Sequence, residues 1–253
     1  MADPTQRFSN RVENYVKYRP DYPKAIIQTL QEECGLTPAT VIADIGSGTG
    51  ILTEMFLKNG NTVFAVEPNR EMRLAAERIL QNYPSLHSVD ATAESTTLTD
   101  SSVDLITAGQ AFHWFDEEKA RVEFMRILKP GGWVVLIWNE RELDTSPFLI
   151  SYEKLLRRFA TDYTEVDHRN VDEAALKTFY GTKGFEIKSF PHHQSFDLES
   201  VQGRLLSSSY APEAGHPNHE PMLAELEKLF HAHKANGKIN FEYRTKIYFG
   251  RLS

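Results

Sequence analysis

The chain has 253 residues, of which 41% are hydrophobic and 25% charged, a balance typical of a globular protein with room for one large core. Its net charge of −7 disfavours broad binding to nucleic acid, and no lysine- or arginine-rich run offsets that charge. The single cysteine, Cys34, excludes an intrachain disulfide and a zinc site built from cysteines.

The start of the chain carries no recognisable targeting signal. Residues 1–6 lack the apolar core of a secretory leader. The longest apolar run, residues 133–138, is too short to span a bilayer. These features, with the net charge, predict a cytoplasmic protein with no nucleic acid and no membrane partner. Composition carries no signal for an oligomeric state.

Strand and helix patterns alternate through about residue 140, which predicts a parallel sheet with crossover helices. A first helix is expected from Pro23 to Gly35, because proline favours a first helical turn and glycine a helix end. The continuous apolar run at 133–138 is typical of a central strand buried on both faces. The elements expected in this half are strands at 40–45, 62–66, 86–90, 103–108 and 133–138, and helices at 50–59, 70–80 and 117–128.

The second half has a different character. Residues 145–182 read as helical, 185–196 as a strand, and 197–236 as helical with loops. Residues 239–249 alternate apolar and polar side chains, which indicates a half-exposed antiparallel strand.

A glycine-rich turn is the first chemical signal. Gly46, Gly48 and Gly50 follow an apolar strand and open a helix. Glycine permits positive φ and lets a ligand approach the backbone, and the helix N-terminus behind the turn suits a carboxylate or phosphate. Glu67 ends the next strand, so its carboxylate is expected beside the turn, where it can accept hydrogen bonds from both hydroxyls of a ribose.

The spacing of the turn separates two classes of cofactor. The dinucleotide pattern G-x-G-x-x-G reserves the place of Ile51 for a small residue, and Asp44 is not part of that fingerprint. The turn therefore favours a cofactor other than NAD. An NAD-dependent oxidoreductase and a catalytically silent cofactor-binding protein are the competing readings.

Ordered motifs between residues 41 and 139 then point to a family. Residues 41–50 resemble the first motif of the class I S-adenosylmethionine methyltransferases, and Glu67 matches the acid with which that family binds ribose. Residues 90–94, 103–108 and 128–132 resemble the family's adenine segment, its fourth strand and the turn before its fifth.

Two further stretches narrow the resemblance. Residues 18–23 and 110–115 are similar to the type 11 group, which includes trans-aconitate methyltransferase-like proteins. The group's pattern implies an N-terminal segment that folds over the cofactor pocket.

The resemblance implies a single methyltransferase domain over residues 1–253. Its fold is expected to be α/β, a Rossmann-like doubly wound sheet of seven strands, mostly parallel with an antiparallel C-terminal strand. Helical insertions at 145–182 and 197–236 are expected to form a substrate cover, and residues 1–35 an N-terminal lid and helix.

The implied cofactor is S-adenosyl-L-methionine. In open α/β sheets, ligands bind beyond the carboxyl ends of the strands, so most of the expected contacts lie there. The expected cofactor-binding residues are Arg19, Asp44, Gly46, Ser47, Gly48, Thr49, Gly50, Glu67, Pro68, Asp90, Thr92, Ala93, Glu94, Ala108 and Gln110.

Three positions carry alternatives. Thr92 stands where members of the group often have Asp, so Thr92 and Ala93 are the first choice for the adenine and Asp90 the second. Arg19 suits the methionyl carboxylate or an acidic substrate, and a surface arginine in a turn is the plainer reading. His113 is the candidate catalytic residue, as substrate anchor or base, or else a structural histidine beside its aromatic neighbours.

The other histidines predict no metal site. None has a recognised metal-binding context with nearby acids. His231 and His233 lie two apart on an expected helix and so face different ways. Structural or surface roles are expected for His168, His192, His193, His216, His219, His231 and His233.

The sequence thus predicts an S-adenosylmethionine-dependent methyltransferase that acts on a small molecule, at an oxygen such as a carboxylate. Methyl transfer chiefly requires alignment and exclusion of water. A carboxylate acceptor needs no base, whereas an acceptor protonated at neutral pH does.

Overall fold

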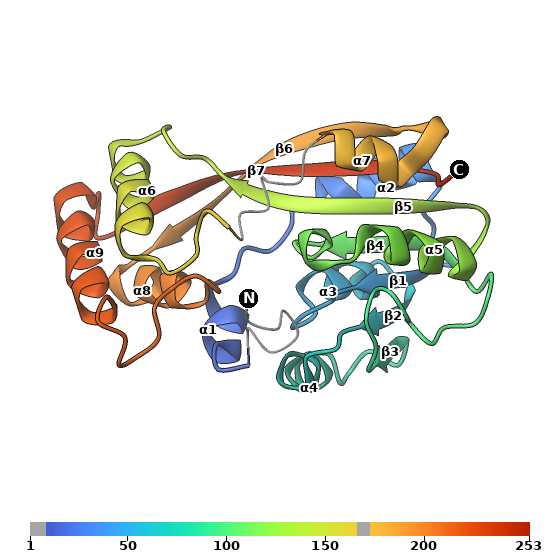
Figure 1. The fold of residues 1–253 in the computed structure, drawn as a ribbon, viewed down its shortest axis with the longest axis horizontal. Coiled ribbons are helices and arrows are strands. Elements are labelled where there is room, and N and C mark those ends of the chain that lie inside the picture. Colours follow the sequence, from blue (N-terminus) through green and yellow to red (C-terminus); the bar gives the residue numbers. More distant parts are fainter. Residues whose placement is uncertain (1–8, 166–172) are drawn as a thin grey trace.

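A computed structural model describes residues 9–165 and 173–253. The chain folds around one seven-stranded sheet with the order β3-β2-β1-β4-β5-β7-β6 (Figure 1). The strands are β1 (Val41–Ile45), β2 (Thr62–Val66), β3 (Leu86–Val89), β4 (Val103–Gly109), β5 (Leu128–Arg141), β6 (Phe185–Phe196) and β7 (Ile239–Gly250).

The pairing confirms the predicted sheet. Strands β1 to β5 pair in parallel, whereas β7 is antiparallel to both β5 and β6. Strand order reverses next to β1, whose neighbours are β2 and β4. The carboxyl ends of these strands therefore meet at the switch point where ligands bind in doubly wound sheets.

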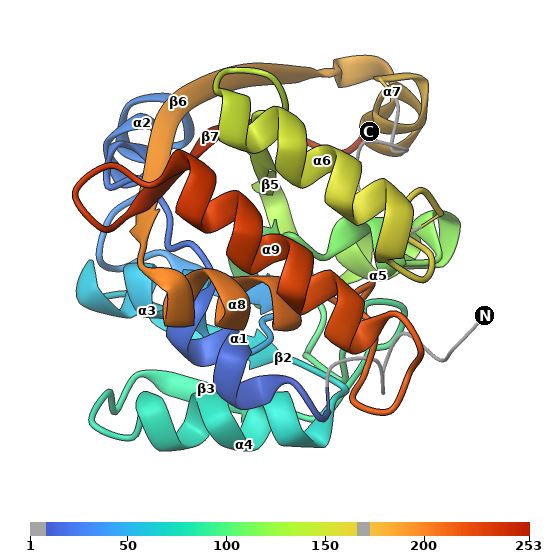
Figure 2. The ribbon, with the colours of Figure 1, turned by 90° about the vertical axis from the view of Figure 1, so that its left-hand side faces the viewer.

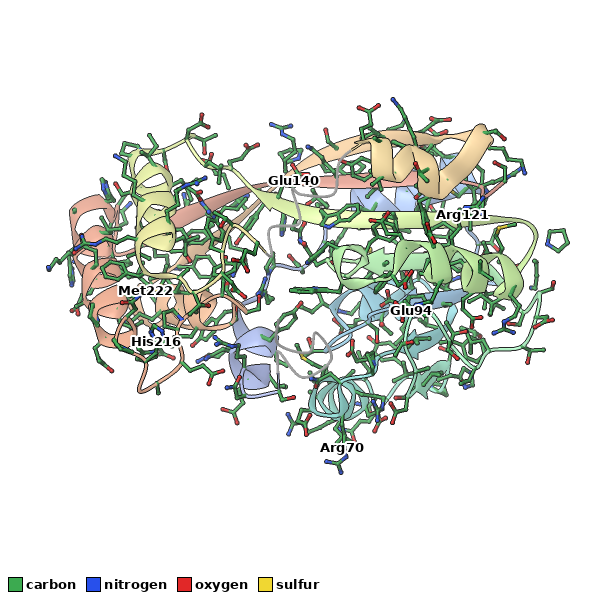
Figure 3. The ribbon with its side chains drawn as sticks, in the orientation of Figure 1. Arg70, Glu94, Arg121, Glu140, His216 and Met222 are labelled. Carbon is green, nitrogen blue, oxygen red and sulfur yellow. The ribbon has the colours of Figure 1, made fainter. Side chains whose placement is uncertain are left out.

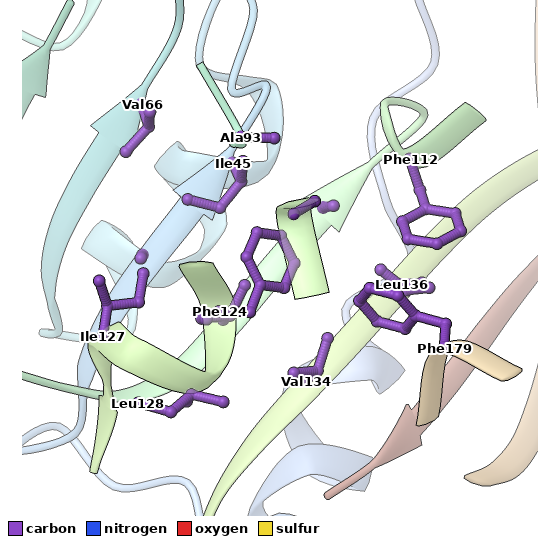
Figure 4. Packing of buried hydrophobic residues seen from close by; sticks show 14 of the residues in the cluster. Ile45, Val66, Ala93, Phe112, Phe124, Ile127, Leu128, Val134, Leu136 and Phe179 are labelled. Carbon is purple, nitrogen blue, oxygen red and sulfur yellow. The ribbon is translucent and has the colours of Figure 1, made fainter. Parts of the chain in front are cut away.

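Helices cover both faces of the sheet. On one face, α2 (Ala25–Cys34) and α3 (Ile51–Lys58) bury Ile26, Leu30 and Phe56. On the other face, α5 (Glu117–Ile127) and α7 (Glu173–Tyr180) contribute side chains to a second cluster, which includes Phe124 and Phe179 (Figure 4). Helix α4 (Arg70–Ile79) connects β2 and β3.

A third cluster lies away from these two and defines what we name the cap: α6 (Pro147–Phe159), α8 (Leu198–Leu206), α9 (His219–His233) and the adjoining ends of β6 and β7. The cap helices lie together at one end of the molecule (Figure 2). Met222 is buried within the cap, whereas Glu94 lies in the half of the molecule that contains β1 to β4 (Figure 3). Phe241, near the start of β7, is fully buried in the cap cluster.

The long strands were only partly predicted. Strand β5 begins at Leu128 rather than at residue 133, because the Gly-rich stretch after Lys129 forms an irregularity in the β4–β5 ladder and not a separate turn. Strands β6 and β7 pair along their whole lengths, from Phe185 opposite Gly250 to Phe196 opposite Ile239. The sheet therefore extends from the half of the molecule that contains β1 to β4, named here the sheet half, into the cap.

The expected helical range 145–182 divides between two cores. Helix α6 packs in the cap, whereas α7 places Phe179 and Tyr180 in the core of the sheet. The Tyr180 hydroxyl also donates to the carbonyl of Tyr248 on β7 at 2.9 Å. The range 197–236 supplies α8 and α9 to the cap. A substrate-covering role for these segments stays a prediction.

The N-terminal region also divides. Helix α2 belongs to the sheet core, whereas α1 (Val12–Tyr18) packs against α8 and α4. Arg11 donates to the carbonyls of Leu206, Ser208 and Ala211, which ties α1 to the end of α8. Among the residues described, no helix has the length and apolarity needed to cross a membrane.

Candidate active site

The Gly-rich turn has the backbone that its glycines predict. Gly46, Gly48 and Gly50 all have positive φ, at 68°, 58° and 85°. A Cβ at Gly46 would lie 2.6 Å from the Cβ of Ala111, and one at Gly50 would lie 2.6 Å from Leu80. A Cβ at Gly48 would meet no atom within 4 Å, so this part of the turn faces open space that a ligand can fill.

Glu67 holds the turn from the end of β2. Its Oε2 accepts from the Gly48 amide and its Oε1 from the Asn69 amide, each at 2.8 Å. Asn69 in turn caps α4, because its side chain accepts from the Met72 amide. Burial raises the pKa of Glu67, while the two amide donors and Arg73 oppose that shift. Each carboxylate oxygen keeps a lone pair for a further donor.

Asp44 ends up beneath the turn rather than on its surface. The carboxylate is fully buried and accepts from the hydroxyls of Thr53 at 2.6 Å and Thr107 at 3.0 Å. Burial raises the pKa of Asp44 to about 6, against the opposing effect of the two hydroxyls. The side chain thus links β1, α3 and β4 below the site.

Two adjoining cavities lie on either side of the turn. They share Tyr15, Gly46, Gly48, Gly109, Gln110 and Trp114. The Glu67 cavity is further lined by Glu67, Pro68, Met72, Thr92, Ala93, Glu94, Ala111 and Phe115. The arginine cavity is further lined by Arg19, Pro20, Tyr22, Asp44, Ser47, Thr49, Ile51, Leu52, His113, Asn139, Arg141, Leu143, Tyr163, Arg204, Ser209 and Tyr210.

The residues of the expected adenine segment, 90–94, do not all line a cavity. Thr92, Ala93 and Glu94 line the Glu67 cavity, beside Pro68. Asp90 lines neither cavity: its carboxylate is largely exposed and pairs with Arg73 at 2.6 Å. The Glu67 cavity is therefore lined by Thr92 and Ala93, the first choice for contact with the adenine, and not by Asp90, the second choice.

The segment after β4 is also divided. Ala108 is buried in the sheet core and lines neither cavity. Gln110 lines both, with φ of 56°, and its side chain donates to the carbonyl of Asn139 at 3.1 Å. The short helix η1 (Phe112–Trp114) follows, where His113 lines the arginine cavity with its ring 4.8 Å from that of Trp114.

The N-terminal segment lies against the arginine cavity. Arg19 donates to the carbonyl of Ser207 at 2.9 Å, and its guanidinium lies 4.7 Å from the ring centroid of Tyr15. Arg19 is half-buried rather than a surface arginine. Residues 1–8 of the expected lid, and His168, lie outside the described residues.

Sequence patterns did not single out the residues on the cap side. Arg141, at the end of β5, and Arg204, on α8, both line the arginine cavity together with Tyr163 and Tyr210. No motif marks these positions, because arginines and tyrosines on helices and strand ends are usually solvent-facing. Only the packing of the cap against the sheet half brings them to the cavity.

The cavity walls fit an S-adenosylmethionine-type ligand. The open face at Gly48 admits a group that no Cβ blocks, and Glu67 offers acceptors for a ribose. The Thr49 hydroxyl is buried and has no hydrogen-bond partner among the residues that the structure describes, so it is available to a polar ligand atom. Over residues 9–165 and 173–253, no three His, Cys, Asp or Glu side chains gather as a metal-binding group.

Comparison with known proteins identifies the family. A family model described as a methyltransferase domain matches residues 43–136, which contain the turn, Glu67 and the adenine segment. An uncharacterized methyltransferase of Schizosaccharomyces pombe is 29% identical over 225 residues, which cover 88% of this chain and 86% of the relative. The chain is a class I S-adenosylmethionine-dependent methyltransferase.

Other similarities extend over the whole chain. A malonyl-[acyl-carrier protein] O-methyltransferase of Marinomonas is 25% identical over 232 residues, 88% of this methyltransferase and 85% of the relative. A solved structure assigned as a type II methyltransferase, from Anaeromyxobacter dehalogenans, superimposes with a TM-score of 0.71. It is 24% identical, and the alignment covers 92% of this methyltransferase and 98% of that chain, so the shared fold includes the cap.

Proposed function

We propose that this methyltransferase transfers a methyl group from S-adenosylmethionine to an oxygen of a small-molecule acceptor, such as a carboxylate. The observation that carries the proposal is the junction of the two cavities at the Gly-rich turn. One cavity offers Glu67 for a ribose, and the other is lined by arginines and tyrosines that suit a small acidic acceptor. The narrower trans-aconitate-like assignment and the cytoplasmic location stay predictions.

When bound, the cofactor would supply a methyl group on a positively charged sulfur, a neutral leaving group once the methyl passes to the acceptor oxygen. The residues of the chain orient the reactants and exclude water. In this proposal Glu67 binds the ribose, Gly48 and Thr49 the methionyl part, and Thr92 and Ala93 the adenine. Gln110 and Pro68 complete the walls.

His113 has a conditional role in the proposal. A carboxylate is already ionised at neutral pH and needs no base, so His113 would then only orient the acceptor. An alcohol acceptor would require His113 to take its proton. An O-methyl outcome is also supported by the relative from Marinomonas, whose name describes an O-methyltransferase.

Ligand-dependent melting tests the cofactor site. We expect S-adenosylhomocysteine to raise the melting temperature of the wild type, because it stabilises only the folded state. Glu67→Gln keeps the shape of the side chain but loses the charged acceptor, which corresponds to about 1.5–3 kcal/mol and a roughly 10- to 100-fold weaker affinity. Calorimetric titration measures the affinities of the wild type and of Glu67→Gln for S-adenosylhomocysteine.

Asp90→Asn is the matched control, because Asp90 lies outside both cavities. It should bind S-adenosylhomocysteine as the wild type does. A wild type that shows no shift at millimolar ligand contradicts the proposed site, as does a Glu67→Gln variant with unchanged affinity. Transfer itself is tested by incubating metabolite pools with methyl-labelled cofactor, where the absence of any labelled methyl ester or methyl ether would contradict O-methylation.

A further inference from the structure

The arginine cavity carries an excess of positive charge. Its lining includes three arginines, Arg19, Arg141 and Arg204, against one carboxylate, that of Asp44. The whole chain has a net charge of −7, so this wall is opposite in sign to the molecule. The partners of each arginine decide which charge is available to a ligand.

Arg141 already has a carboxylate partner. It forms an ion pair with Glu153 on α6 at 2.7 Å, and the two side chains are 10% and 11% exposed. The hydroxyl of Tyr163 donates to the same carboxylate at 2.7 Å. Arg141 and Glu153 thus form a buried pair that holds α6 to β5, and the contact occupies the Arg141 guanidinium, although Glu153 also pairs with the more exposed Arg157 at 2.9 Å.

Arg19 has no carboxylate partner in the described structure. It donates to the carbonyl of Ser207, and its Nε is buried without a hydrogen bond. Removal from water lowers the pKa of Arg19, and the nearby Arg204 guanidinium lowers it further, so the two cations lie close enough to repel each other. An anion between or beside them would relieve that repulsion.

Arg204 is the more deeply buried of these two cations, at 7% exposed. Its Nε donates to the hydroxyl of Tyr243 at 3.2 Å, and its Nη1 to the hydroxyl of Ser208 at 3.1 Å. Tyr243 in turn donates to Gln194 at 3.1 Å, which fixes the guanidinium between β6, β7 and α8. These contacts are to neutral groups, so within the described residues no side chain neutralises Arg204.

The cofactor supplies too few negative charges to satisfy both cations. S-adenosylmethionine has one carboxylate, together with a sulfonium and an ammonium that add positive charge. If Arg19 pairs with that carboxylate, Arg204 still faces the cavity without an anion. We propose that Arg204 binds a carboxylate of the methyl acceptor and thereby restricts the acceptors of this enzyme to acids. A single guanidinium matches a monoanionic, planar carboxylate in charge and geometry better than it matches a dianionic phosphate.

This inference rests on the proposed methyltransferase function and names its substrate class. The test uses binding to the complex with S-adenosylhomocysteine, so it needs no known acceptor. The probes are hexanoate, glutarate and benzoate, their matched amides, and phenyl phosphate. We expect at least one acid to raise the melting temperature of the wild-type complex, and neither its amide nor phenyl phosphate to do so.

Three variants separate the two arginines. Arg204→Gln should weaken binding of the acid at least tenfold and leave the affinity for S-adenosylhomocysteine within about threefold. Arg204→Lys keeps the charge and should retain part of the affinity for the acid. Arg19→Gln should weaken S-adenosylhomocysteine itself at least tenfold. Arg244→Gln is the control, because Arg244 is exposed and pairs with Glu142 outside the cavity.

The outcomes are distinguishable. A wild type that does not bind S-adenosylhomocysteine would contradict the proposed function as a whole. Intact cofactor binding with no response to any acid would overturn only the inference. An amide that binds as well as its acid, or an Arg204→Gln variant that binds the acid as the wild type does, would also overturn it. A stronger response to phenyl phosphate than to the acids would replace the carboxylate with a phosphate.

Discussion

At the scale of single residues, the site contains a carboxylate whose ionised form is destabilised by burial. Asp44 is fully buried and accepts from two threonine hydroxyls, yet burial still raises its pKa to about 6 from an ordinary value of 3.8. The folded protein therefore binds this proton more tightly than the unfolded chain does. Ionised Asp44 lowers the free energy of unfolding above pH 6, and this cost disappears as the pH falls from about 6 to about 4.

Asp44→Asn should therefore stabilise the protein at neutral pH. A pKa difference of this size corresponds to about 3 kcal/mol, and we expect a gain of about 1–3 kcal/mol at pH 7.5 that vanishes near pH 4. Urea unfolding at both pH values measures it. Asp100→Asn is the control, since Asp100 is an exposed partner of Arg126 and its removal should give no such gain. An equal gain at both pH values would contradict the explanation.

At the scale of elements, one close contact outside the sheet joins α1 to α8. Gly203 lies in the middle of α8, where a Cβ would overlap the ring of Tyr18. Glycine inside a helix normally costs about 0.5–1 kcal/mol relative to alanine. Here that cost permits the contact that places Arg19, just after α1, next to the end of α8.

Gly203→Ala should consequently destabilise the protein rather than stabilise it. Overlap with a packed ring costs about 1–3 kcal/mol. The displacement of α1 should also weaken S-adenosylhomocysteine binding and speed proteolytic cleavage near α1. Gln202→Ala in the same helix provides the comparison and should raise or leave unchanged the free energy of unfolding. If the two variants melt alike, α1 does not depend on this contact.

Local pattern predicted most elements but not their partners. Strand β2 matches its expected bounds, the bounds of α4, α5 and β3 differ from expectation by one residue at one end, and those of α3 by one residue at each end, because hydrophobic period and capping residues are local signals. Helix α1 was missed, since a seven-residue helix leaves little periodicity to read. The placement of α7 on the sheet, and of Arg204 at the cavity, depends on contacts between distant segments that no local pattern encodes. Gly46, Gly48, Gly50 and Glu67 were readable because their chemistry follows from their spacing.

At the scale of the whole molecule, the cap and the sheet half share continuous strands. Phe241 is fully buried in the cap, with its ring 4.8 Å from that of Tyr152, while the other end of β7 pairs with β5 in the sheet core. Damage to the cap is therefore expected to reach the rest of the fold through the ladder.

Phe241→Ala should lower the free energy of unfolding by about 3–5 kcal/mol. We expect calorimetry to show one transition at a lower temperature, not an early transition of the cap alone. Ile187→Ala, at a half-exposed position of β6, should change stability little. Two resolved transitions in the variant would mean that the cap unfolds independently.

The extended strands also determine how ligands can be exchanged. Strands β5, β6 and β7 are paired along the sheet and resist bending, so the cap is not expected to swing open about them. The N-terminal segment is attached differently, through the arginine contacts of Arg11 and Arg19 with carbonyls and through the packing at Gly203. We therefore expect this segment, rather than the cap, to move when ligands exchange. Turnover would then be limited by the rate at which α1 detaches from α8 and returns.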